Sequence, residues 1–302
     1  MKKTLFLILL LNLCCSLFAQ TLVVSEKAND ENLANYTVTN DVAYGSNPEQ
    51  KMDLYLAKDA EKLGAKNSTI VFLHGGGWYM SDKTDVKRYI LPYLNKGYNV
   101  INLNYRLKKG VPVAAEDLSL ALNYLQTSDT HKMHNLGKVI LSGFSSGGHI
   151  AALVGLSANN KSYKNRLNKG IRIKAIIDFS GPTDQLDVVE KRFIDWKLAI
   201  SESLSTSDIG NAMFPAEGYV SRDSITEYEP ITYWDKKDPP FFLWYGGKDD
   251  QVFPSTFENF VKLLNQDMKK NVVVFGSEFG HSPKKVELSE AYKQIFLFLE
   301  GI

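Results

Sequence analysis

The sequence predicts an α/β fold with a mostly parallel central sheet and helices on both faces. Short, continuous apolar runs recur along the chain, and segments of helical length separate them. A continuous apolar run is typical of a strand that is buried on both faces. Alternation of such strands with helices indicates parallel strands joined by right-handed crossovers.

The predicted elements follow in a regular order. Residues 21–50 are polar with scattered β-forming residues, and we expect an N-terminal arm there. Alternating polarity predicts an early strand at 52–56. Buried strands are predicted at 69–73, 98–103, 138–141, 173–177 and 241–244, and a further strand at 272–275. Helices are predicted at 84–95, 114–125, 150–156, 256–264 and 288–299.

Residues 185–238 interrupt this alternation. The segment is long and polar, and aromatic residues are scattered through it. We expect a small insertion over the C-terminal edge of the sheet, where folds of this class bind ligands. An irregular surface excursion is the alternative.

The first residues of the chain resemble no part of the predicted domain. Two lysines precede an apolar run that extends to Leu13, and a small residue, Ala19, follows. This order is typical of a secretory signal peptide, so we expect residues 1–19 to be removed by cleavage after Ala19 and the protein to be secreted or periplasmic. The run is shorter than the roughly 20 residues of a membrane span. An uncleaved anchor is the alternative; a lipoprotein is disfavoured because no small residue precedes Cys14 or Cys15.

This cleavage changes the cysteine content and the charge. It removes both cysteines, so the exported protein holds no disulfide and depends on its core for stability. It also lowers the formal net charge from +1 to −1. We therefore expect no nucleic-acid partner and no stable membrane insertion after cleavage. Residues 20–302 are expected to form one domain, since 44% hydrophobic and 23% charged residues exclude a disordered or fibrous chain.

The motif with the most specific chemistry is GFSSG at 143–147, which has the form G-x-S-x-G. It stands between a predicted buried strand and a predicted helix, which is the context that the motif requires. Glycines at both ends lack the Cβ atoms that would clash in so tight a turn. We expect Ser145 to project above the sheet as a nucleophile, with a glycine-rich turn as the alternative.

A second glycine cluster, HGGGW at 74–78, directly follows another predicted strand. Successive glycines expose backbone N–H groups, and a tetrahedral oxyanion needs two or three such donors. We assign the N–H groups of Gly76 and Gly77 to an oxyanion hole, with the Ser146 N–H as a third donor. Trp78 is assigned to substrate binding, and packing in the core stays open as its alternative.

The base must be one of five histidines. His281 follows the last predicted strand, late in the chain as the order serine, acid, histidine requires, and we predict that it is the base. His74 is expected to brace the glycine loop by hydrogen bonding. His149 is expected to be structural. His131 and His134 have no third ligand nearby, which favours solvated side chains over a metal site.

The acid should lie between the nucleophile and the base, at the end of a strand. Asp249 and Asp250 both follow the predicted strand at 241–244 and compete for this role. Asp184, after the preceding strand, is a more distant candidate. The residues alone leave the choice between the two neighbours open.

Together, HGGGW, GFSSGGH, GGKDDQV and the late GH resemble the carboxylesterase branch of the α/β-hydrolases over roughly residues 40–300. That branch includes hormone-sensitive-lipase-like esterases, feruloyl and acetyl-xylan esterases, and arylformamidases. The resemblance implies the α/β-hydrolase fold. It places the acid two residues after the second glycine of GGKDDQV, at Asp249, with Val252 three residues further on. It also implies scaffold roles for residues 104–106 and Asp117.

The chain departs from this family's pattern at two positions. Tyr245 stands where many relatives carry histidine, and Ser146 stands where they often carry alanine. Neither departure removes a catalytic group, because residue 146 is expected to contribute only its backbone N–H.

These residues predict a serine ester hydrolase that needs no metal or cofactor. His281 takes the proton of Ser145, the serine attacks the ester carbonyl, and water hydrolyses the acyl-enzyme. We expect small-molecule esters with short acyl chains or carbohydrate-linked esters as substrates. The alternatives are an amide or formamide hydrolase or an exopeptidase of the same fold, and a non-catalytic binding protein, which the presence of all three triad residues disfavours.

Overall fold

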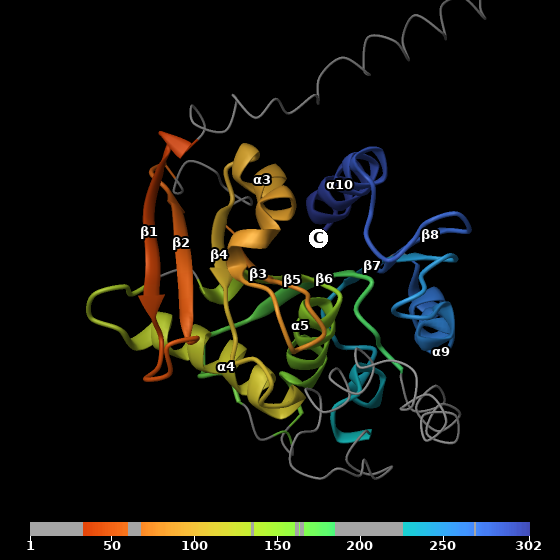
Figure 1. The fold of residues 1–302 in the computed structure, drawn as a ribbon, viewed down its shortest axis with the longest axis horizontal. Helices are drawn as coiled ribbons and strands as arrows, with labels where there is room; N and C mark the ends of the chain where they lie inside the picture. Colours follow the sequence, from red (N-terminus) through yellow and green to blue (C-terminus); the bar gives the residue numbers. More distant parts are fainter. Residues whose placement is uncertain are drawn as a thin grey trace, which may run out of the picture.

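The computed structural model describes residues 33–59, 68–133, 136–160, 163, 166–184, 226–268 and 270–302. In this part of the chain, eight strands form a single sheet in the order β1-β2-β4-β3-β5-β6-β7-β8 (Figure 1). β1 and β2, and β2 and β4, are antiparallel, and the remaining pairs are parallel. An α/β-hydrolase fold with a mostly parallel sheet is therefore confirmed.

The parallel strands coincide closely with the apolar runs of the sequence. The strands are β1 (Tyr36–Ala43), β2 (Lys51–Ala57), β3 (Thr69–Leu73), β4 (Asn99–Leu103), β5 (Val139–Phe144), β6 (Ile173–Phe179), β7 (Phe241–Gly246) and β8 (Val272–Gly276). Every residue of β3, β4 and β7 is buried. Burial on both faces explains why these strands read as continuous apolar segments rather than as alternating ones.

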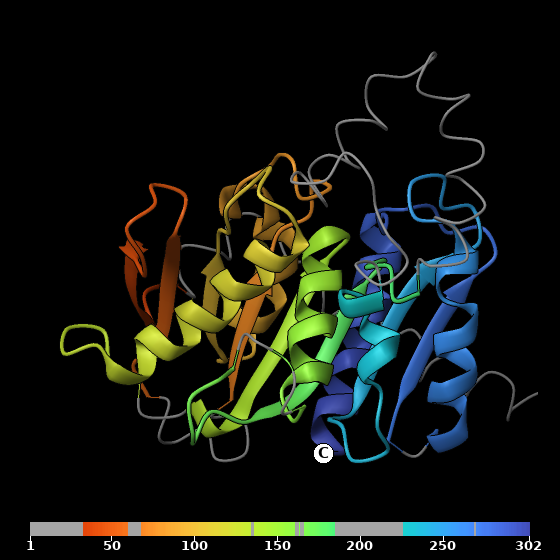
Figure 2. The same ribbon diagram turned by 90° about the horizontal axis from the view of Figure 1, so that it is seen from below.

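Helices cover both faces of the sheet. The α-helices are α3 (Lys87–Asn95), α4 (Val111–Thr127), α5 (Ser146–Ser157), α9 (Glu258–Leu264) and α10 (Lys285–Glu300). Short 3-10 helices are η2 (Lys83–Val86), η3 (Leu136–Lys138), η4 (Pro230–Tyr233), η5 (Pro254–Thr256) and η6 (Asn265–Asp267). α3 and α10 lie on one face, whereas α4, α5 and α9 lie side by side on the other (Figures 1 and 2).

The core is divided by the sheet into two layers. Ile70 and Phe72 of β3 pack with α3 and α10, whereas Val71 and Leu73 pack with α4 and α5. This division follows from the period of two residues in a strand. α5 lies against the middle of the sheet, and all of its residues are buried.

The expectation of an N-terminal arm over residues 21–50 was wrong for part of that range, because β1 forms the outer strand of the sheet. β1 exposes most of its side chains, and only Tyr36 and Val42 are buried in it. An edge strand with so few inward apolar residues gives a weak pattern in the sequence. The Tyr36 hydroxyl donates to the Leu94 and Tyr98 carbonyls at 2.8 and 3.0 Å, which ties the edge strand to α3.

Two predicted helices are divided in the structure. The segment expected to be helical at 84–95 is η2 followed by α3, and the one at 256–264 contains the end of η5 and then α9. Of the expected insertion at 185–238, residues 185–225 lie outside the described residues. No helix within the described ranges has the length and apolar character needed to cross a membrane.

Candidate active site

The candidate site lies at the carboxyl edge of the parallel strands. The segment with His74 follows β3, Ser145 follows β5, Asp249 follows β7 and His281 follows β8. Because parallel strands end at the same edge of a sheet, four segments far apart in the sequence meet there.

Ser145 forms the turn between β5 and α5 in a strained backbone conformation. Its φ is 55° and its ψ is −124°, in a region that residues with a Cβ rarely occupy. The Ser145 N–H donates to the Phe179 carbonyl at 2.8 Å, and the His149 N–H donates to the Ser145 carbonyl at 3.0 Å. The two bonds hold both sides of the strained peptide, which is the geometry of a nucleophile elbow.

The glycines around this turn permit close backbone contacts. A Cβ on Gly143 would lie 2.3 Å from the Gly147 carbonyl group, and one on Gly147 would lie 2.3 Å from the Leu73 carbonyl oxygen. The lack of a side chain at Gly143 therefore lets the turn close on itself, and the lack of one at Gly147 lets the turn pack directly onto the end of β3.

Replacing Gly147 by alanine is expected to lower the free energy of unfolding by about 2 kcal/mol or more, because the new methyl group would overlap backbone atoms that cannot move independently. Gly137→Ala is the matched control, since its Cβ would meet no atom closer than 3.9 Å. Urea unfolding of both variants measures the difference. Equal stability of the two variants would contradict the packing described here.

The structure brings Ser145, His281 and Asp249 into one hydrogen-bonded line. His281 Nε2 lies 2.9 Å from Ser145 Oγ, and His281 Nδ1 lies 2.8 Å from Asp249 Oδ2. All three residues are buried. A carboxylate only accepts, so His281 donates from Nδ1 and leaves Nε2 free to accept the proton of Ser145.

The three aspartates considered for the acid differ clearly in position. Asp249 Oδ1 accepts the N–H groups of Gln251 and Val252 at 2.9 and 2.8 Å, which orients Oδ2 toward His281. Asp250 is exposed. Asp184 accepts a hydrogen bond from Asn259 at 2.8 Å and is not part of the line.

The glycine loop after β3 presents backbone donors near Ser145. Gly76 and Gly77 have φ values of 109° and 60°, which glycine adopts at little cost. The N–H groups of both glycines find no backbone acceptor within the described ranges. The Ser146 N–H, at the first position of α5, precedes the helix's own hydrogen bonds. These are the three donors that the sequence assigns to an oxyanion hole.

The remaining histidines take no part in the line. His74 Nδ1 lies 2.6 Å from the Gly75 carbonyl oxygen, which fits a bracing role in the loop. His149 Nε2 lies 2.8 Å from the Tyr228 carbonyl oxygen, and burial lowers the pKa of His149 to about 4. His131 Nδ1 lies 3.1 Å from the Tyr124 hydroxyl, and His134 lies outside the described residues.

Trp78 is 5% exposed and packs in the core between the glycine loop and α5. Its ring meets His149 edge to face, with centroids 5.2 Å apart. Tyr228 belongs to the described end of the interrupting segment, so the contact between its carbonyl oxygen and His149 connects that segment to α5.

Asp178 was not singled out in the sequence, although it lies directly beneath the turn. Its side chain is fully buried at the end of β6, and Oδ1 accepts the Gly181 N–H at 2.7 Å. Burial raises the pKa of Asp178 well above its ordinary value. A single acidic residue in the otherwise apolar end of β6 is the signal that could have identified it.

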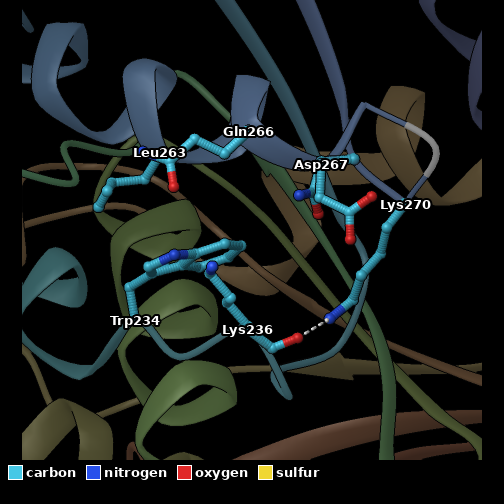
Figure 3. Close-up of a pocket in the computed structure, with 7 residues that line it drawn as sticks. Trp234, Lys236, Leu263, Gln266, Asp267 and Lys270 are labelled. Atoms are coloured by element: carbon cyan, nitrogen blue, oxygen red, sulfur yellow. Dashed lines mark hydrogen bonds between the residues drawn. The ribbon is translucent and has the colours of Figure 1, made fainter.

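A cavity of about 140 Å³ lies away from this site. Its lining includes Trp234, Gln266, Asp267 and Lys270, whose side chains surround a shallow space beside the end of α9 (Figure 3). These residues precede β8, so the cavity lies at the opposite edge of the sheet from His281. Among the described residues, no cluster of three or more His, Cys, Asp or Glu side chains is placed to hold a metal ion.

The sequence of this chain is similar to a family model and to several curated proteins. The BD-FAE family model matches residues 52–264, a range that contains Ser145 and Asp249 and ends before His281. Esterase LipC of Mycobacterium tuberculosis is 23% identical over 241 residues, which cover 76% of this chain and 56% of LipC. Probable carboxylesterase 4, mitochondrial, of Arabidopsis thaliana is 23% identical over 57% of this chain and 50% of its own length. The chain thus spans about half the length of these curated relatives.

Solved structures show the same fold at low sequence identity. A truncated form of a carbohydrate esterase from gut microbiota aligns with a TM-score of 0.67 and 20% identity, over 88% of this chain and 98% of that one. Esterase B from Lactobacillus rhamnosis, in an inhibited form, aligns with a TM-score of 0.67 and 17% identity, over 96% and 95%.

Proposed function

Because the chain belongs to the BD-FAE family, an α/β-hydrolase esterase family, we propose that it is a carboxylic ester hydrolase with Ser145 as nucleophile. The observation that carries the proposal is the line from Ser145 through His281 to Asp249, with distances of 2.9 and 2.8 Å. The strained turn that presents the serine supports the same assignment, since strain of this kind is held in place at functional sites.

In the proposed reaction, His281 Nε2 accepts the proton of Ser145 as its Oγ attacks the ester carbonyl. Asp249 holds the imidazole in the required tautomer and stabilises the imidazolium that forms. His281 then protonates the leaving alkoxide, and an acyl-enzyme remains on Ser145. In the second half, His281 takes a proton from water, hydroxide attacks the acyl group, and the proton returns to Ser145.

The proposed oxyanion donors are the N–H groups of Gly76, Gly77 and Ser146. Two come from the glycine loop and one from the start of the nucleophile helix, so the carbonyl oxygen would be held between them. Charge that develops on that oxygen also meets the positive end of α5.

We propose short-chain acyl esters or carbohydrate-linked esters as the substrate class. The support from the structure is that Trp78, directly after the glycine loop, is 5% exposed and packs edge to face on His149, so its ring does not line an open space for a long acyl chain. Two structural neighbours are described as a carbohydrate esterase from gut microbiota and a bifunctional GH43-CE protein of Bacteroides eggerthii. Their likeness shows the fold, and the substrate class is carried over as a proposal.

We also propose export of the protein. The support is the order of charged, apolar and small residues over positions 1–19, with cleavage after Ala19. N-terminal sequencing of protein from the culture medium or periplasm of the producing cell tests this. An N-terminus at Gln20 supports export, and an intact N-terminus in the cytoplasm contradicts it.

A substrate series tests the proposed function. We expect kcat/KM to be highest for nitrophenyl acetate, lower for the butyrate and at least about tenfold lower for the octanoate, a difference of roughly 1.4 kcal/mol in transition-state binding. Methyl ferulate and acetylated xylan test for carbohydrate-linked esters. Faster turnover of the octanoate than of the acetate would contradict the short-chain proposal.

A matched ester and amide separate the two hydrolase classes. Nitrophenyl acetate and nitroacetanilide share the acetyl group and differ in the leaving atom. Higher kcat/KM for the ester supports the proposal, whereas a higher value for the amide makes the chain an amide hydrolase of the same fold.

A further inference from the structure

Two buried hydroxyl groups lie between the glycine loop and the start of α5. Tyr105 follows β4, Ser146 begins α5, and each residue is 1% exposed. The Tyr105 hydroxyl lies 3.1 Å from Ser146 Oγ and 3.1 Å from the His74 carbonyl oxygen. The two hydroxyls therefore connect the two segments that carry the proposed oxyanion donors.

The direction of this hydrogen-bonded chain follows from its protons. A carbonyl oxygen only accepts, so Tyr105 gives its single O–H to His74. Ser146 then donates its own proton to the Tyr105 oxygen. Burial raises the pKa of Tyr105 above its ordinary value, which keeps the hydroxyl protonated and able to donate.

His74 extends the chain to the next peptide of the loop. Its ring stacks on Tyr105 with centroids 4.4 Å apart and an angle of 13° between the planes. Its Nδ1–H donates to the Gly75 carbonyl oxygen at 2.6 Å, and burial lowers the pKa of His74, which favours the neutral ring. Because C=O and N–H point in opposite directions across a trans peptide, holding the Gly75 oxygen sets the direction of the Gly76 N–H.

The glycine loop needs such external support. Glycine peptides can rotate with little steric resistance. The peptide that carries the Gly77 N–H is held within the loop, because the Gly76 carbonyl accepts the Tyr79 and Met80 N–H groups at 3.0 Å each. The peptide that carries the Gly76 N–H has no such backbone bond to its carbonyl, Gly75, within the described ranges, so it depends on the side chains around it. An oxyanion donor that points in the wrong direction contributes nothing to the transition state, since the stabilisation depends on a preorganised dipole.

We propose that Tyr105 and Ser146 are positioning residues that keep the glycine-loop donors in register with the Ser146 N–H, an inference that rests on the proposed function. Neither side chain touches the substrate. Both act through the backbone: Tyr105 through the His74 carbonyl, and Ser146 by fixing Tyr105 relative to α5. The serine at 146 thereby gains a role for its side chain, where the family often carries alanine.

Tyr105→Phe and Tyr93→Phe form a matched pair of variants. Tyr93 is also fully buried, and its hydroxyl lies 3.4 Å from Ser142 Oγ on β5, away from the glycine loop. Tyr93→Phe removes a buried Tyr–Ser contact, whereas Tyr105→Phe removes such a contact and also the bond to the His74 carbonyl, so we expect the decrease in Tm to be at least as large for Tyr105→Phe. Only Tyr105→Phe is expected to lower kcat for nitrophenyl acetate, by about tenfold, with KM changed less than about twofold. The rate constant for labelling by a fluorophosphonate should fall by a similar factor.

Ser146→Ala provides a second measurement, which still tests the proposal if Tyr105→Phe fails to fold. We expect a decrease of about threefold in kcat, and a double variant no slower than Tyr105→Phe, because both changes interrupt one chain. If kcat falls no further in Tyr105→Phe than in Tyr93→Phe, or if only KM changes, the positioning role of Tyr105 is overturned. A wild-type kcat in Ser146→Ala overturns the positioning role of Ser146.

The same measurements separate this inference from the proposed function. A wild-type protein that is labelled but hydrolyses no ester overturns ester hydrolysis, and the labelling rates of the variants still decide the positioning role. A wild-type protein that is neither labelled nor active overturns both.

Discussion

Ser145→Ala is expected to lower kcat for nitrophenyl acetate by about 10⁶-fold, the scale found when a triad serine is removed from a serine protease. The reason is that the covalent route is lost entirely, and only binding and the oxyanion donors remain. Labelling by a fluorophosphonate should also disappear. The alanine variant should retain the fold. Serine and alanine both carry a Cβ, so the strain at a φ of 55° is unchanged, and the smaller side chain adds no new clash.

Ser282→Ala is the control for this change. Ser282 follows His281 directly, is exposed, and accepts a hydrogen bond from Arg88 at 2.6 Å. We expect its kcat to remain within about threefold of the wild type. If Ser145→Ala were still fully labelled, another residue would be the nucleophile.

Asp249→Asn is expected to lower kcat by up to about 10⁴-fold, the scale of an acid-to-amide change in a serine protease triad. The side chain explains the size of the effect. An asparagine oxygen would stay with the N–H groups of Gln251 and Val252, which now hold Asp249 Oδ1. Its NH₂ group would then face His281 Nδ1 and favour the tautomer protonated at Nε2, which cannot accept the proton of Ser145.

Asp250→Asn is the matched control, because it makes the same chemical change one residue away on an exposed side chain. We expect a decrease of about tenfold or less. Steady-state kinetics of both variants at one pH, with one nitrophenyl ester, compare them directly. A severe loss of kcat in Asp250→Asn, with near-normal kcat in Asp249→Asn, would show that the acid is Asp250 and not Asp249.

Much of the fold and of the candidate site could be predicted from local sequence. Strands buried on both faces leave continuous apolar runs, which is why β3 and β7 were expected within two residues of their observed ends. The GFSSG and HGGGW clusters are contiguous because a strained turn and a loop of free N–H groups each need several glycines in succession. The order serine, acid, histidine along the chain then indicated His281 as the base.

Other features depend on contacts that local sequence does not contain. Asp249 and Asp250 are chemically identical, and only the family resemblance chose between them; in the structure, the difference is burial and two backbone N–H bonds. β1 was missed because its partner, β2, and not its own composition, makes it a strand. The chain from Ser146 through Tyr105 to His74 joins positions 41 and 31 residues apart.

The central claim, that Ser145 is the nucleophile of an acyl-transfer site, is tested most directly by locating the covalent adduct. The wild-type protein is treated with a fluorophosphonate, digested and mapped by mass spectrometry, with Asp249→Asn and His281→Ala as slower-reacting comparisons. We expect one adduct per chain, on Ser145, formed far more slowly in both variants because the serine is no longer activated. An adduct on a different residue, or equal labelling rates in all three proteins, would contradict the account.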